Sequence, residues 1–218
     1  MFSHINRVVK LMVITDFFVN SAFGSFAPIF AIFIADRIAV GNSAPEIAGF
    51  ATSVYWIVKS AVQLPIARFL DRIDGDRAKF WAVFIGYICS GFVPFFYTLI
   101  SAPWHLYVLQ GFLGLCMAFA VPAWYGLFTR HVDKWRISFE WSLESVFSVG
   151  IATALASAFG GYAARVFGFD AVFIGASVLA ILSSFLFVFL YKDLTGEKKP
   201  PLQRVFPERR HRRLQSHK

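Results

Sequence analysis

Six long apolar runs take up most of this sequence and restrict what the chain can fold into. They span residues 11–35, 48–69, 80–100, 104–128, 139–165 and 171–191. A helix needs roughly 20 apolar residues to cross the hydrocarbon core of a bilayer, and every run has that length. Because 57% of the 218 residues are hydrophobic, the composition excludes a soluble domain. The sequence therefore predicts an all-α membrane protein whose six transmembrane helices form one bundle at residues 1–192.

The Lys and Arg residues between these runs are divided unequally between the two sides of the predicted membrane. One side receives 18 of the 21, and the other receives only Arg37 and Arg165. Cytoplasmic loops carry the excess of basic residues, so we expect a multi-pass protein of the cytoplasmic (inner) membrane with both termini in the cytoplasm. Residues 193–218 predict a basic, disordered cytoplasmic tail that touches anionic lipid. Docking of another molecule through this tail is the alternative, and we do not expect nucleic acid as a partner.

The remaining basic residue, Lys59, lies inside the second apolar run, in the stretch VYWIVKSAVQLP. A lysine at the centre of a bilayer costs about 3 kcal/mol on insertion scales, so we expect a polar partner or a cavity around it. Thr52, Tyr55 and Gln63 share its helix face, because successive members of this set lie three or four residues apart. The second run therefore presents one polar stripe.

Polar residues also interrupt three of the other runs. The first run carries Asp16 and Asn20 one helical turn apart, the fourth carries Gln110, and the fifth carries Glu144 among several serines. The third and sixth runs have no charged residue within their apolar cores. We expect the first, second, fourth and fifth helices to line a polar interior, and the third and sixth to face lipid.

Depth in the membrane indicates which of these groups can meet. From the helical rise, Asp16 is the expected counter-charge of Lys59, and Gln63, one turn away, is its expected hydrogen-bonding neighbour. A packing pair, or a lysine that reaches the membrane surface, is the alternative for Lys59. For Asp16 and Glu144 the structural role comes first, and Glu144 is a secondary candidate for the pathway of a substrate or coupling ion.

Two loops resemble those of a known family. The stretch ARFLDRIDGDRAKF, residues 67–80, is similar to the G-x-x-x-D-R-x-G-R-[RK] signature of the major facilitator superfamily, with Asp71 and Arg72 at its D-R pair. It departs from that signature at Ala67, where glycine is usual, and by one extra residue before Gly75. The stretch GGYAARVFGFDAVF, residues 160–173, resembles the turn from the fifth to the sixth helix of that family.

The resemblance covers nearly the whole chain and implies one six-helix half of a fold that normally has twelve helices. The similar segments FAPIFAIFI and FAVPAWYGLF agree with the three-plus-three inverted repeat of such a half. The implied function is that of a secondary active transporter protomer, which works by alternating access as a homodimer or with a second six-helix half. A non-transporting membrane scaffold that docks through its basic tail is the alternative.

The resemblance also assigns roles to residues. Asp71 and Arg72 become a gating motif, and the substrate or coupling-ion pathway comprises Lys59, Asp16, Asn20, Gln63, Gln110 and Tyr55. Proton-coupled drug antiport is not indicated, because Gln110 stands where many proton-coupled members carry arginine before a glycine, here Gly114. The sequence has no catalytic or metal-binding motif, so we expect no enzyme activity, no cofactor and no metal. Cys89 and Cys116 are interpreted as packing residues.

Overall fold

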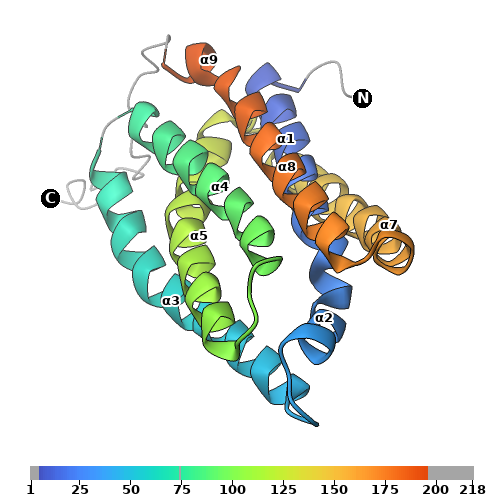
Figure 1. The fold of residues 1–218 in the computed structure, drawn as a ribbon. Helices are drawn as coiled ribbons and strands as arrows, with labels where there is room; N and C mark the ends of the chain where they lie inside the picture. The colour runs from blue at the N-terminus through green and yellow to red at the C-terminus, as the bar shows by residue number, and fades with distance from the viewer. Residues whose placement is uncertain (1–4, 74, 196–218) are drawn as a thin grey trace, which may run out of the picture.

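The computed structural model describes residues 5–73 and 75–195, and the regular elements among them are all helical (Figure 1). The first long segment comprises α1 (Arg7–Phe26), the 3-10 turn η1 (Ala27–Ile29) and α2 (Phe30–Arg37). It is followed by α3 (Ala44–Arg72), α4 (Arg77–Tyr97), α5 (Pro103–His131), α6 (Ile137–Leu143), the π-helical η2 (Glu144–Ile151), α7 (Ala152–Phe167), α8 (Phe169–Val188) and α9 (Tyr191–Thr195). Each predicted apolar run thus falls on one long helical segment, while nearly all of the predicted tail, 193–218, lies outside the described residues.

Five of these segments are long and apolar enough to cross a membrane. They are Arg7–Arg37, Arg77–Tyr97, Pro103–His131, Ile137–Phe167 and Phe169–Val188. The segment outside this set, α3, is 29 residues long but carries the polar stripe around Lys59. The all-α membrane architecture is confirmed, and a sixth crossing by α3 stays a prediction.

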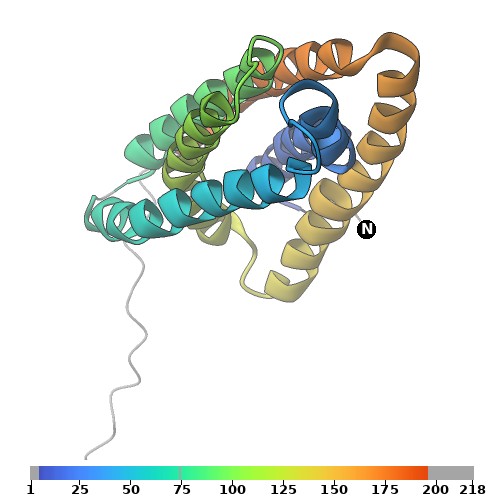
Figure 2. The same ribbon diagram turned by 60° about the horizontal axis from the view of Figure 1, so that its bottom comes forward.

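The helices pack in a fixed series that relates the first three segments to the last three. The closest packing joins α3 to α5, α5 to α4, α4 to α8, α8 to α1 and α1 to α7, and Figure 2 shows the resulting ring-like arrangement. If α1, α3 and α4 are exchanged with α5, α7 and α8, respectively, the same set of packed helix pairs is obtained. Since three crossings separate equivalent helices, the two sets run in opposite directions, which is the geometry of an inverted repeat.

Glycines fix two of the joints in this arrangement. At Gly114 on α5, a Cβ atom would lie 2.6 Å from the Tyr55 carbonyl oxygen, so only glycine lets α3 approach α5 this closely. That approach brings the turn from Tyr55 to Lys59 against α5. At Gly168, which separates α7 from α8, φ is +83°, a conformation that favours glycine. The structure therefore has the turn between the fifth and sixth segments at the predicted place.

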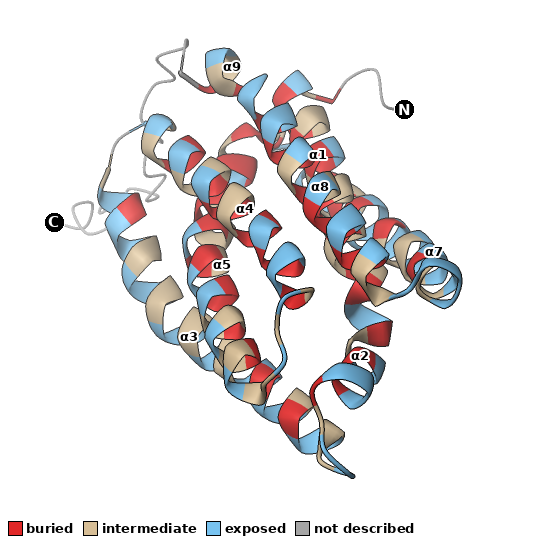
Figure 3. Ribbon diagram, in the orientation of Figure 1, coloured by how far each residue is buried: buried red, intermediate tan, exposed pale blue. Residues whose placement is uncertain are grey.

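Apolar side chains cover both the interior and much of the outer surface. One buried cluster, at the end of the bundle near α9, includes Met12, Phe80 and Phe128, and the other, at the opposite end, includes Phe33 and Phe173. Figure 3 shows exposed residues along α3 and α7, and many of these are large and apolar: Phe50, Trp56, Ile57, Leu64, Phe69, Leu155, Phe159, Tyr162, Val166 and Phe167. A surface of this kind suits a hydrocarbon environment or a further helical unit.

Candidate functional site

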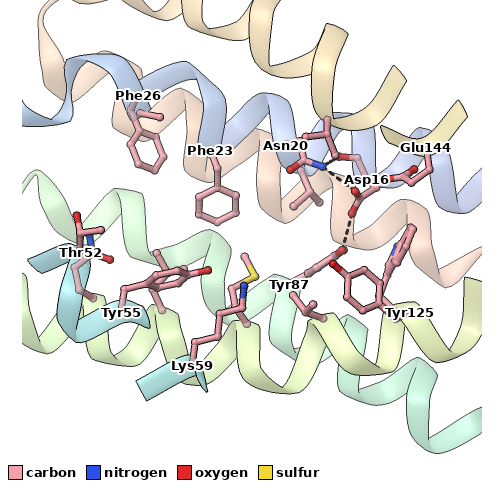
Figure 4. Close-up of a pocket in the computed structure, with 18 of the residues that line it drawn as sticks. Asp16, Asn20, Phe23, Phe26, Thr52, Tyr55, Lys59, Tyr87, Tyr125 and Glu144 are labelled. Atoms are coloured by element: carbon pink, nitrogen blue, oxygen red, sulfur yellow. Dashed lines mark hydrogen bonds between the residues drawn. The ribbon is translucent and has the colours of Figure 1, made fainter. Parts of the chain in front are cut away.

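A cavity of about 640 Å³ lies between the helices of the two repeats. Its walls come from α1, α3, α4, α5 and the α6–η2 segment, so residues far apart in the sequence share it. Among the lining residues are six of the predicted pathway residues and candidates: Asp16, Asn20, Tyr55, Lys59, Gln110 and Glu144. The close-up in Figure 4 shows that the acidic groups and Lys59 occupy different parts of this cavity.

Asp16, on α1, is held by hydrogen bonds from two side chains. The Tyr87 hydroxyl, on α4, donates to one carboxylate oxygen at 2.7 Å, and the Asn20 amide donates to the other, also at 2.7 Å (Figure 4). The Glu144 carboxyl, on η2, lies beside Asp16 in Figure 4. A carboxylate has only acceptor oxygens, so a hydrogen bond between these two groups requires one proton between them.

Glu144 begins the π-helical turn η2 and is fixed by the serine one turn later. Ser148 Oγ lies 2.7 Å from a Glu144 carboxyl oxygen and 2.9 Å from the Val13 carbonyl oxygen on α1. Because Ser148 has a single hydroxyl hydrogen, it donates to the Glu144 carboxylate or to the Val13 carbonyl oxygen, but it cannot donate fully to both at once. The wider π-helical turn brings Glu144 and Ser148 to the α1 surface together, and π-helical turns are frequent at functional sites.

Lys59 extends into the cavity from α3 without a carboxylate partner. Its Nζ lies 4.7 Å from the centre of the Trp56 ring and 5.5 Å from that of Tyr55. Among residues 5–73 and 75–195 it forms neither an ion pair nor a hydrogen bond. The predicted ion pair with Asp16 is therefore not formed in this structure, where Asp16 instead accepts hydrogen bonds from Tyr87 and Asn20.

The other polar residues of the α3 stripe divide between the cavity and its edge. Thr52 and Tyr55 line the cavity, and Gln110 faces them from α5, one turn before Gly114. Gln63 is half-buried but does not line the cavity, so the structure does not bring it into the site with Lys59. The stripe reaches the cavity only over its first two turns, from Thr52 to Lys59.

The third segment was predicted to face lipid, and for one of its faces that prediction is wrong. Tyr87 and Tyr97 of α4 both line the cavity, and Tyr87 is buried against Asp16. The prediction relied on charged residues alone, whereas a tyrosine buries its ring among apolar neighbours and still presents a hydroxyl. No α8 residue is among those that line the cavity, as predicted for the sixth segment.

In the loop between α3 and α4, the residues that form ion pairs are not the predicted gating pair, Asp71 and Arg72. Asp71 and Arg72 are exposed at the end of α3 and form no ion pair with any residue that the structure describes. Asp76, which sequence reasoning did not select, lies 3.0 Å from Arg130 and 3.7 Å from His131 at the end of α5. An acidic residue just before a helix, facing a basic helix end, was the available signal for this contact.

The described residues contain no group of three or more His, Cys, Asp or Glu side chains arranged to hold a metal ion. Cys89 and Cys116 are both free thiols. Chemically, the site offers an ammonium group at one place, a hydrogen-bonded carboxyl pair at another, and aromatic walls between them (Figure 4).

Comparison with known proteins gives one match. The family model described as Major Facilitator Superfamily matches residues 11–215, which is nearly the whole chain. No curated protein and no solved structure matches the chain.

Proposed function

The chain belongs to the major facilitator superfamily and is a multi-pass membrane transporter of that kind, and from this premise we propose that it works as one six-helix half by alternating access on a small solute. The observation that carries the proposal is the cavity between the repeats, which collects the polar groups of four apolar segments and also Tyr87. Polar groups gathered in this way in a membrane protein mark the path of a solute or an ion.

The proposed half needs a second six-helix unit to close its cavity. Thr52 and Ser145 line the cavity yet are exposed, and Lys59 is only half-buried. In a bilayer these groups would meet lipid unless another unit covers them. A second copy of the chain, related by a two-fold axis along the membrane normal, is the simplest cover and resembles the two halves of a longer transporter.

Within this proposal the polar residues have separate roles. Lys59, Tyr55, Asn20 and Gln110 contact the solute, and Gln63 joins them in states where α3 has turned or shifted. Asp16 and Glu144 carry a coupling proton between them.

The gating role rests on the family resemblance. Asp71 and Arg72 hold the predicted cytoplasmic ends of the two units together, with Asp71 against the start of the partner unit's fifth segment, at residues 138–142. Asp71→Asn should then favour the state open to the cytoplasm without unfolding the protein. Unchanged labelling from both sides would leave Asp71 as a solvated loop charge.

Alternating access is tested by labelling cavity positions from each side of the membrane. Single cysteines at Thr52 and Ser145, in a background in which Cys89 and Cys116 are replaced by alanine, are treated with a membrane-impermeant maleimide. We expect each position to react from both sides, and a cross-link that locks one side to abolish labelling from that side alone. Reaction from one side only, in every condition, would contradict alternating access.

The same cysteines test the assembly. We expect disulfide cross-links between protomers from Thr52→Cys and Ser145→Cys, and none from Leu182→Cys, which is exposed on α8 and does not line the cavity. A protein that stays monomeric in nanodiscs, with no cross-link and no second six-helix unit, would contradict the dimer.

A further inference from the structure

We propose that the solute of this cavity is an organic anion with an apolar body that contains a ring, and that Lys59 recognises its anionic group. The inference deepens the proposed transport function and rests on it. It follows from the charge of the cavity, from the occupied state of its acids and from the chemistry of its walls.

The first step concerns the charge that the cavity presents. Lys59 is the single basic residue among the described residues that line it. Its ammonium carries three donor hydrogens, while its close contacts are the ring faces of Tyr55 and Trp56. Ring faces attract a cation but do not neutralise it, and a charge inside a membrane needs a counter-charge. The described residues supply no such counter-charge to Lys59.

The second step compares the acids of the cavity with Lys59, because the acids form no ion pair with it and already have partners from the protein. Asp16 accepts hydrogen bonds on both carboxylate oxygens, and Glu144 is in contact with Ser148 and lies beside Asp16. Lys59 has no such hydrogen bonds with the described residues, so an anion reaches it without competing with a group of the protein.

The third step concerns the body of the solute. The cavity is lined by nine aromatic side chains, drawn from five segments: Phe23, Phe26, Phe30, Tyr55, Tyr87, Tyr97, Trp124, Tyr125 and Trp141. Its volume of about 640 Å³ is within the range of sites for small organic molecules. An inorganic anion would leave these walls facing empty space, while a ring can pack against their faces and edges.

Two further polar groups that line the cavity add to the fit for an anion. Gln110 is buried on α5 and supplies an amide, and the Tyr55 hydroxyl makes no hydrogen bond with any residue that the structure describes. Both groups can donate to a carboxylate held by the ammonium, and hydrogen bonds to ionised groups are the stronger ones.

Three probes of one shape separate the possible charges of the solute. They are 3-phenylpropanoate, 3-phenylpropanamide and 3-phenylpropylamine, which share the ring and the linker and differ in their polar group. Binding to the full chain in nanodiscs is followed by calorimetry and by quenching of tryptophan fluorescence. We expect the propanoate to bind about tenfold tighter than the amide, and the amine to bind least well.

Substitutions in the chain test whether Lys59 is the source of the preference for the anionic probe. Lys59→Met should reduce the preference for propanoate over amide to about twofold or less, while amide binding stays unchanged. Lys134→Met, at an exposed loop position that does not line the cavity, is the matched control and should leave every affinity unchanged. Lys59→Arg keeps the charge and should keep the preference for propanoate over amide. This variant still tests the role of the charge if Lys59→Met does not fold.

Three results would overturn the inference: equal binding of propanoate and amide, tightest binding of the amine, or no binding of propanoate at millimolar concentration. The second result would assign recognition to Asp16 and Glu144 instead. Labelling of Thr52→Cys and Ser145→Cys needs no ligand, so it reports on alternating access separately. If that labelling alternates and the anion preference is absent, the solute class is wrong and the transport mechanism stands.

Discussion

The acidic and basic ends of the cavity differ in whether their charged groups have hydrogen-bond partners within the protein. At the acidic end, the Asp16 and Glu144 carboxyl groups meet Tyr87, Asn20 and Ser148 from three segments. At the basic end, Lys59 meets aromatic rings and no hydrogen-bond acceptor among the described residues. A buried charge with partners from the protein is part of the fold, whereas one without them is poised to take a partner from outside.

This difference also separates two kinds of transport role. The acidic end is preorganised by these hydrogen bonds, and the proton that we propose it carries needs little space. The basic end adjoins the open volume of the cavity and its aromatic walls, which suits a larger solute. Substitutions at the two ends should therefore affect different measurements.

The largest effect is expected at the basic end, on uptake. Lys59→Met keeps the length of the side chain and removes the charge, so uptake of 3-phenylpropanoate into proteoliposomes should fall by about 30-fold or more. Thermal stability should change little, by no more than about 3 °C in Tm, because the ammonium forms no hydrogen bond or ion pair with the described residues.

The arginine variant distinguishes charge from shape at the same position. Lys59→Arg should retain part of the uptake if charge alone matters, and little of it if a compact ammonium is required. Wild-type uptake by Lys59→Met would show that the basic end has a packing role only.

A smaller effect is expected from two matched tyrosine substitutions, this time on stability. Tyr87→Phe removes a hydroxyl that donates to Asp16 and should lower the free energy of unfolding by about 1–2 kcal/mol. Tyr55→Phe, at the basic end, removes a hydroxyl without a hydrogen bond to any described residue, and should cost less than about 0.5 kcal/mol. Unfolding of both variants in the same lipid–detergent mixture measures the difference. Equal costs, or a larger cost at Tyr55, would remove the contrast between the ends.

The sequence was sufficient for the helical architecture because apolar length is a local property. The six runs and the turn at Gly168 each depend on a short stretch, and each appears where predicted. The polar stripe from Thr52 to Lys59 was also readable, since helical spacing alone puts its members on one face.

The sequence did not predict which side chains the charged residues contact, because these contacts depend on how the helices turn and pack. Depth along the membrane suggested that Lys59 meets Asp16, but depth says nothing of which way each side chain points. The prediction for the third run considered charged residues alone and so passed over Tyr87, which donates a hydrogen bond to Asp16. The contact of Asp76 with Arg130 also depends on two helix ends meeting, which no single stretch of sequence reports.

The smallest expected effect is a coupling energy close to zero between the two ends. If Lys59 and Asp16 formed a structural pair, removing one charge would strand the other, and removing both would restore stability. In this structure they share no hydrogen-bond partner, so the stability costs of Lys59→Met and Asp16→Asn should add to within about 0.5 kcal/mol. The double variant should also stay inactive in uptake, because the solute still lacks its counter-charge. A coupling above about 1 kcal/mol, with stability and uptake both restored in the double variant, would show that Lys59 and Asp16 form one packing pair. The two ends would then not have separate roles.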